Sequence, residues 1–256
     1  AYTKDSAATE DEIFSAVMVG DQLMACGTNG LYNVDVENGY AMEKLTNMQE
    51  DVVFTDMAYS PHLDLTLATY GTFVLVVDPT AQYGHAGGWN LKSAFSTLAG
   101  ITYAGHDNTY DYFYLLSGNG SLYLAGLQKG EDGKYTLGLL SILTTDKSLA
   151  ITGQYMYQSL FYDLDTGWIY WARYDDSTES SSIIAINEDT EEVVLRGTFD
   201  DAAWPVVGLY NAKAAVTDAD RTGAYNFSEN SSLAPDLALG ESIEAIPAES
   251  ITSLAD

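Results

Sequence analysis

Hydrophobic and polar positions along this chain follow one pattern that occurs four times. Each unit has an apolar strand, a short acidic or glycine-containing turn, a second strand, another turn and a third strand. The four units read IFSAVMVGDQLMACGTNGLYNVDVENG, VFTDMAYSPHLDLTLATYGTFVLVVDPT, GITYAGHDNTYDYFYLLSGNGSLYLAGLQKG and YQSLFYDLDTGWIYWARYDDSTESSSIIAINEDTEE. The pattern predicts repeated β-structure, and long stretches with helical periodicity are absent.

The spacing of the units matches that of propeller blades. The second strands begin near Leu23, Leu65, Phe113 and Ile169, at intervals of 42, 48 and 56 residues. WD40 blades repeat at about 40–45 residues and kelch blades at about 50. A fourth strand is expected after each trio, in AMEKLTN, KSAFSTL, YTLGLLSIL and VVLRGTF. Because one four-stranded sheet cannot bury both of its faces alone, we predict an all-β propeller, with a β-sandwich as the alternative.

The pattern also predicts how the chain is divided. Residues 1–12 are expected to form an N-terminal arm and residues 13–211 the propeller. After Phe199 the segment AAWPVVGLYN resembles a fifth first strand, but no clear second and third strands follow it. Residues 212–256 are therefore expected to hold a partial blade and an acidic C-terminal tail or linker towards further domains. The ring either closes as a small propeller or belongs to a larger one.

The net charge of the chain limits the classes of partner that it is expected to bind. The 256 residues include 37 acidic and 10 basic side chains, for a net charge of −27. This charge disfavours nucleic acid and anionic membrane surfaces, and it suits divalent cations, neutral glycans or basic partners. Cys26 is the only cysteine, which excludes an intrachain disulfide and a cysteine-based zinc site. Membrane insertion is not expected, because no apolar run reaches the roughly 18 residues of a membrane helix.

The fourth unit resembles a blade of the YWTD-type propeller family. Asp163, Gly167, Ile169, Tyr170 and Trp171 follow the order of that family's signature, D-x-x-x-G/N-x-[IL]-Y-W, and SSIIAIN supplies a third strand. The Thr-Asp that follows the Tyr-Trp pair in the family is replaced here by Ala-Arg, and the other three units keep only the hydrophobic outline. The resemblance implies a propeller and no particular activity, since propellers include both enzymes and binding modules.

The same stretch is similar to the Asp-box of sialidases, S-x-D-x-G-x-x-W. Asp165 and Gly167 match that box, whereas Asp163 takes the place of its serine. The box is a structural hairpin, in which an aspartate side chain accepts backbone N–H bonds. A calcium site formed by Asp163, Asp165 and Asp175 is the alternative, although the EF-hand pattern is absent.

The chain as a whole resembles acidic, tyrosine-rich propeller regions of secreted multidomain surface proteins of Gram-positive bacteria. The closing IEAIPAESITSLAD is similar to the junctions that precede immunoglobulin-like modules in such proteins. The resemblance implies an extracellular or cell-surface location and further domains in the same polypeptide.

Aromatic side chains in or beside loops are the strongest ligand-binding candidates. Trp89, Tyr83, Trp168 and Trp204 are expected to bind a glycan or a protein by stacking and apolar contact, unless they cap the core between blades. We therefore predict a non-catalytic binding or scaffold propeller. A glycoside hydrolase or lyase with paired carboxylates and a purely structural spacer are the alternatives.

Three histidines complete the candidate chemistry. His62 and His106 occupy related places at the exits of successive first strands, so they are expected to approach each other at one face of the ring. This placement would allow a metal site made of two histidines and an acid. The alternative is that the histidines are ordinary residues of surface turns. His85 is expected in a loop, in YGHAGGWN.

Overall fold

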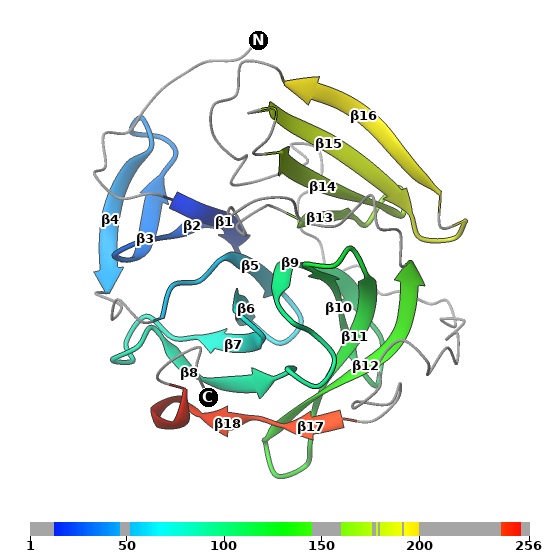
Figure 1. Ribbon diagram of the computed structural model, residues 1–256. Coiled ribbons are helices and arrows are strands. Elements are labelled where there is room, and N and C mark those ends of the chain that lie inside the picture. The colour runs from blue at the N-terminus through cyan, green and yellow to red at the C-terminus, as the bar shows by residue number, and fades with distance from the viewer. Residues whose placement is uncertain are drawn as a thin grey trace.

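A computed structural model shows a four-bladed β-propeller (Figure 1). The structure describes residues 13–46, 52–144, 160–175, 178, 180–190, 192–199 and 242–251. Blade 1 consists of β1(Ile13–Val19), β2(Gln22–Gly27), β3(Gly30–Asp35) and β4(Ala41–Thr46), and blade 2 of β5(Asp56–Ser60), β6(Leu65–Tyr70), β7(Phe73–Val77) and β8(His85–Asn90). Blade 3 consists of β9(Leu98–His106), β10(Asp111–Ser117), β11(Leu122–Lys129) and β12(Tyr135–Thr144), and blade 4 of β13(Leu160–Asp163), β14(Trp168–Asp175), β15(Ser180–Asn187) and β16(Val193–Phe199). The predicted fold class is confirmed, and the β-sandwich is not formed.

Each blade is an antiparallel meander whose strands pair in sequence order, with the first strand nearest the centre of the ring. The second strands begin within two residues of the expected positions, at Gln22, Leu65, Asp111 and Trp168. The predicted fourth strand of blade 2, KSAFSTL, is wrong. The fourth strand is β8, and Lys92–Ala94 form a turn before Phe95 enters the core. His85 therefore lies in a strand and is buried, not in a loop.

The strands of blade 3 are apolar on both faces because this blade packs between blades 2 and 4. Every residue of β10 is buried. Phe113 and Leu115 belong to the core shared with blade 2, whereas Tyr112 and Tyr114 belong to the core shared with blade 4. Side chains of a strand alternate between its two faces, so this single strand contributes to two cores. The continuous apolar run in YDYFYLLS follows from that double burial.

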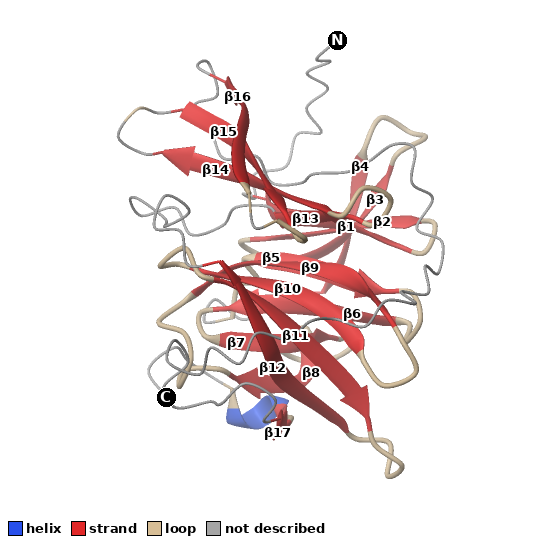
Figure 2. Ribbon diagram, turned by 90° about the vertical axis from the view of Figure 1, so that its right-hand side faces the viewer, coloured by secondary structure: helices blue, strands red, loops and turns tan. Residues whose placement is uncertain are grey.

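Three hydrophobic cores join successive blades, whose sheets are seen stacked in Figure 2. The core between blades 1 and 2 contains the thiol of Cys26, whose pKa is raised by burial and which contacts the Phe54 carbonyl oxygen at 3.4 Å. Cys26 is thus a small core residue, as its apolar surroundings in the sequence indicate. A smaller cluster lies on the other face of blade 1 and includes Ala25, Tyr32 and Val34.

One buried carboxylate connects the four inner strands at the centre of the ring. Asp56 at the start of β5 accepts hydrogen bonds from the Ser15 hydroxyl of β1 at 2.8 Å and from the Ile101 N–H of β9 at 2.8 Å. Its own neighbour Met57 donates a backbone N–H at 2.9 Å, and a backbone hydrogen bond from Leu160 of β13 also favours the ionised form. Burial outweighs these bonds and raises the pKa of Asp56 to about 7.

A C-terminal segment follows the outer edges of two blades (Figure 1). We call residues 242–251 the strap; it contains β17(Ser242–Glu244), β18(Ile246–Pro247) and the short helix η3(Ala248–Ser250). β17 pairs with β12 and β18 pairs with β8, so this part of the expected tail adds an edge strand to blades 3 and 2. Residues 200–241 lie outside the described residues, so the domain boundary near 212 stays a prediction. Within the described part of the chain, no helix is long and apolar enough to cross a bilayer.

Candidate functional site

The topology places two sets of turns on one face of the ring. In an antiparallel meander, the turn between strands one and two lies on the same side as the turn between strands three and four. We call this side the turn face. Its turns are residues 20–21, 36–40, 61–64, 78–84, 107–110, 130–134, 164–167 and 188–192.

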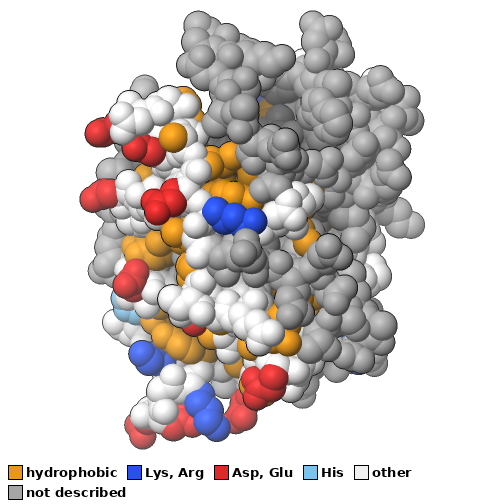
Figure 3. Space-filling model, turned by 90° about the vertical axis from the view of Figure 1, so that its left-hand side faces the viewer, with side chains coloured by type: hydrophobic (Ala, Val, Ile, Leu, Met, Phe, Trp, Pro, Cys, Tyr) orange, Lys and Arg blue, Asp and Glu red, His pale blue; other side chains and the backbone are white. Residues whose placement is uncertain are grey.

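The turn face carries a strong excess of carboxylates. Lys134 is the one Lys or Arg in the described residues of these turns. The acidic side chains of the same turns are Asp21, Glu37, Asp64, Asp78, Asp107, Glu131, Asp132, Asp165, Glu188, Asp189 and Glu192. The described turns between second and third strands, at 28–29, 71–72 and 118–121, hold no charged residue. In the view of Figure 3, the acidic side chains gather along the left margin and at the lower end of the molecule.

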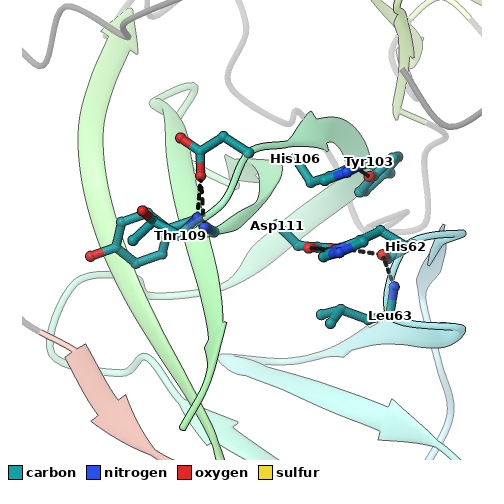
Figure 4. A network of polar contacts seen from close by, with 9 residues as sticks. His62, Leu63, Tyr103, His106, Thr109 and Asp111 are labelled. Carbon is teal, nitrogen blue, oxygen red and sulfur yellow. Dashed lines mark hydrogen bonds and ion pairs between the residues drawn. The ribbon is translucent and has the colours of Figure 1, made fainter. Parts of the chain in front are cut away.

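Two histidines meet on the turn face, between blades 2 and 3 (Figure 4). The rings of His62 and His106 are parallel within 2°, with centroids 3.9 Å apart. His62 lies in the turn after β5, and His106 ends β9. The expected approach of these two residues is confirmed, because equivalent positions of neighbouring blades lie side by side around a propeller.

Asp111 fixes the orientation of His62. Its Oδ1 lies 2.7 Å from His62 Nδ1, and its carboxylate is almost completely buried. The Ser60 hydroxyl donates to Asp111 Oδ2 and also accepts the Leu63 N–H at 3.1 Å, which closes the turn. A neutral His62 must carry its proton on Nδ1 to meet this carboxylate, so Nε2 is left as an acceptor. The imidazole is 43% exposed, so part of this ring is open to solvent on the turn face.

His106 forms the buried base of the cluster. The Tyr103 hydroxyl and His106 Nδ1 are 3.1 Å apart, and the Tyr103 ring meets Phe113 edge-on. Asp107, the next residue, accepts the N–H groups of Thr109 and Tyr110 at 2.7 and 2.9 Å and so shapes the turn after β9. The stack is thus held between two structured turns, and the exposed His62 ring rests on a rigid support.

The geometry does not converge on a metal ion. Imidazole lone pairs lie in the plane of the ring, and the planes of His62 and His106 run parallel, so their nitrogen atoms do not point to one centre. In the part of the chain that the structure describes, no group of three or more His, Cys, Asp or Glu residues is arranged to hold a metal.

Hydrogen bonds to Asp163 close the Asp-rich turn of blade 4. The Asp163 carboxylate accepts the Asp165 N–H at 3.1 Å, and the Asp163 carbonyl oxygen accepts the Gly167 N–H at 2.9 Å. Gly167 has φ +70, a backbone conformation that favours glycine. The Asp165 side chain is exposed, whereas the side chain of Asp175 lies outside the described residues. A calcium site at this turn stays a prediction.

The four candidate aromatic residues have different environments. Trp89 is completely buried in the core between blades 2 and 3, so it has no surface to offer a ligand. Tyr83 and Trp168 are half-buried, and both lie at the turn face. The Arg196 guanidinium lies over the Trp168 ring, 4.6 Å from its centroid, and covers one side of it. Trp204 lies outside the described residues.

A further acidic residue of this face is missed by the sequence pattern. Glu188, in the turn before β16, accepts the hydroxyls of Tyr114 at 2.6 Å and Tyr162 at 2.7 Å. Burial raises the pKa of Glu188, and the nearby Asp189 acts in the same direction. These bonds join blades 3 and 4 and position the turn that carries Asp189. The acidic INEDTEE turn is visible in the sequence, but its two tyrosine partners lie 74 and 26 residues away.

Comparisons with known proteins show no relative in sequence. No family model matches the chain, and no curated protein matches it. Among solved structures, it is similar to PorZ, a surface component of the type-IX secretion system of Porphyromonas gingivalis, with 15% identity over 77% of this chain and 21% of that chain, at a TM-score of 0.40.

Two further likenesses are to a chain of a nidogen/laminin complex and to the WD40 propeller domain of Doa1. The first has 10% identity over 77% of this chain and 84% of that chain, at a TM-score of 0.44. The second has 11% identity over 78% of this chain and 85% of that chain, at a TM-score of 0.38. The chain spans 21% and 55% of the lengths of the first two solved structures that it matches. The fold assignment rests on the sheets of this chain itself.

Proposed function

We propose that this propeller is a non-catalytic binding module whose turn face recognises a protein partner with a basic surface. The observation that carries the proposal is the uneven distribution of charge between two sets of described turns, those of the turn face and those between second and third strands. The described turns of one face hold eleven carboxylates against one lysine, and the described turns between second and third strands hold none. Such a field attracts and orients a cationic partner before contact.

Two of the predicted aromatic residues, Trp89 and Trp168, offer little surface to a glycan. Sugar stacking needs an open aromatic face, but Trp89 is buried and Arg196 covers one side of Trp168. The exposed His62 and the half-buried Tyr83 add polar and apolar contacts to the acidic surroundings. The carboxylates would attract the basic partner at long range, and the ordered side chains would contact it once it is bound. The extracellular location is part of this proposal and rests on the sequence resemblance.

The test compares two sets of charge changes. The turn-face variant carries Glu37→Gln, Glu131→Gln and Asp189→Asn, three exposed side chains for which no hydrogen bond is seen. The matched control carries three exposed acids from the outer edges of the blades and the strap, changed in Glu43→Gln, Glu244→Gln and Glu249→Gln. Both variants change the net charge by the same amount.

Binding to an immobilised oligolysine peptide and to a neutral oligosaccharide array is then measured for each protein. We expect the unmodified chain to bind the peptide, with affinity that falls as salt rises, and the turn-face variant to lose at least tenfold in affinity. The control variant should stay within threefold of the unmodified chain. Equal losses in both variants, or binding to an oligosaccharide but not to the peptide, would overturn the proposal.

A further inference from the structure

The strap pairs with the outer edges of two blades, beyond the four strands that each blade forms in sequence order. Among the residues that the structure describes, blades 1 and 4 consist of four strands each. The strap adds a fifth strand to blade 3 through β17 and a fifth strand to blade 2 through β18. In the sequence, 42 residues separate Phe199 at the end of blade 4 from Ser242.

The edge that receives the strap is built for backbone recognition. The five paired positions on β12 and β8 are Thr136, Leu137, Gly138, Gly88 and Gly87. Three of these five are glycines, which let another main chain approach closely. At Gly87 a Cβ atom would lie 2.3 Å from the Ile246 carbonyl oxygen, and Gly87 has φ +128. Any larger residue at Gly87 would therefore collide with the backbone of the strap.

Side chains of the strap supply the specificity. Ile243 packs against the core between blades 2 and 3, whereas Ile246 and the fully buried Ile251 pack in the core between blades 1 and 2. Main-chain pairing with pockets for apolar side chains is the pattern of strand addition to a sheet edge. Glu244 and Glu249 point into solvent, so charge contributes little to this contact.

We infer that the joint outer edge of blades 2 and 3 is a strand-binding site, and that the strap is an exchangeable peptide ligand of this site. The ligand is a peptide that is extended around Ile243 and Ile246 and turns through a short helix before Ile251. This site lies on the outer rim and is independent of the turn face, so either proposal can fail without the other. An unpaired strand edge attracts strands of other chains, and the strap covers two such edges.

The experiment cuts the full chain after it has folded. A recognition sequence for a specific protease is inserted between Phe199 and Ser242, and the folded protein is cleaved. We expect the C-terminal fragment to co-elute with the propeller on size exclusion. A synthetic, isotopically heavy peptide of residues 240–254 in 100-fold excess should then replace the fragment, as mass spectrometry of the eluted complex would show.

The substitutions are made in the added peptide, so the propeller itself stays unchanged. A heavy peptide with Ile246→Asp or Ile251→Asp should exchange at least tenfold less, whereas the matched Glu249→Gln peptide should exchange like the parent. Release of the fragment on cleavage, with the propeller still folded, would overturn the inference. So would a fragment that leaves only when the propeller unfolds, since it would then be a fixed part of the core.

Discussion

Asp56 accepts the backbone N–H of Ile101 at 2.8 Å, which links the inner strands of blades 2 and 3 at the centre of the ring. The same carboxylate accepts a hydrogen bond from the Ser15 hydroxyl of blade 1, so one side chain is hydrogen-bonded to several blades. Its environment favours the neutral form, because burial raises its pKa to about 7. The centre of the propeller is thus a titrating position within the ordinary pH range of experiments.

The stability of the fold should therefore fall as pH rises from about 4 to about 7. In this window the folded state keeps a proton on Asp56 that the unfolded chain, with its ordinary pKa of 3.8, has lost. At 1.36 kcal/mol per pKa unit, the change in the free energy of unfolding is about 4 kcal/mol at most. Thermal unfolding followed by circular dichroism at pH 5, 6, 7 and 8 measures it.

A control separates the effect of Asp56 on the pH dependence of stability from that of the general repulsion among the 37 acidic residues. Asp56→Asn should remove most of the pH dependence between pH 5 and 8, whereas Glu43→Gln, at an exposed site, should leave it unchanged. Equal slopes for Asp56→Asn and the unmodified protein would contradict the titration of Asp56 between pH 5 and 8.

Asp111 should determine the tautomer of His62. The 2.7 Å contact between Asp111 Oδ1 and His62 Nδ1 requires the neutral ring to carry its proton on Nδ1. Long-range ¹H–¹⁵N correlation spectra should show that tautomer in the unmodified chain and a shift towards the Nε2–H form in Asp111→Asn. The same change should cost about 1–3 kcal/mol of stability, because an amide replaces a buried carboxylate that is hydrogen-bonded to both His62 and Ser60. A His62 spectrum unchanged by Asp111→Asn would contradict the assignment.

Arg196 should shield the indole of Trp168. Removal of the guanidinium in Arg196→Ala should increase quenching of Trp168 fluorescence by acrylamide and cost about 0.5–1 kcal/mol, the range for exposed cation–π contacts. The signal of Trp168 is obtained as the difference from a Trp168→Phe variant. Arg196→Lys, which keeps a cation at this position, should give an intermediate value, and no change in Arg196→Ala would rule out the contact in solution.

The sequence predicts the blades well because the repeated pattern is local. The second strand of each unit and the fourth strand VVLRGTF are found where the alternation places them. The strand β8, HAGGWN, is missed because glycines weaken the local strand signal. Two of these glycines pair with the strap, a contact between residues about 160 positions apart that no local pattern reveals.

The candidate site is predicted only in part for the same reason. The approach of His62 and His106 follows from their equivalent places in successive units, and the turn chemistry of Asp163 follows from its spacing to Gly167. The burial of Trp89 depends on packing between two blades, so its place in a loop-like sequence is misleading. The central role of Asp56 requires several inner strands at once, and DMAYS alone carries no trace of it.

The central claim is that one face of the ring is the binding face, and hydrogen–deuterium exchange of the chain with and without the oligolysine peptide tests it most directly. We predict slower exchange in the turns at 36–40, 130–134 and 188–190 and no change in those at 71–72 and 118–121. Protection at 71–72 and 118–121, or protection spread evenly over both faces, would contradict the claim.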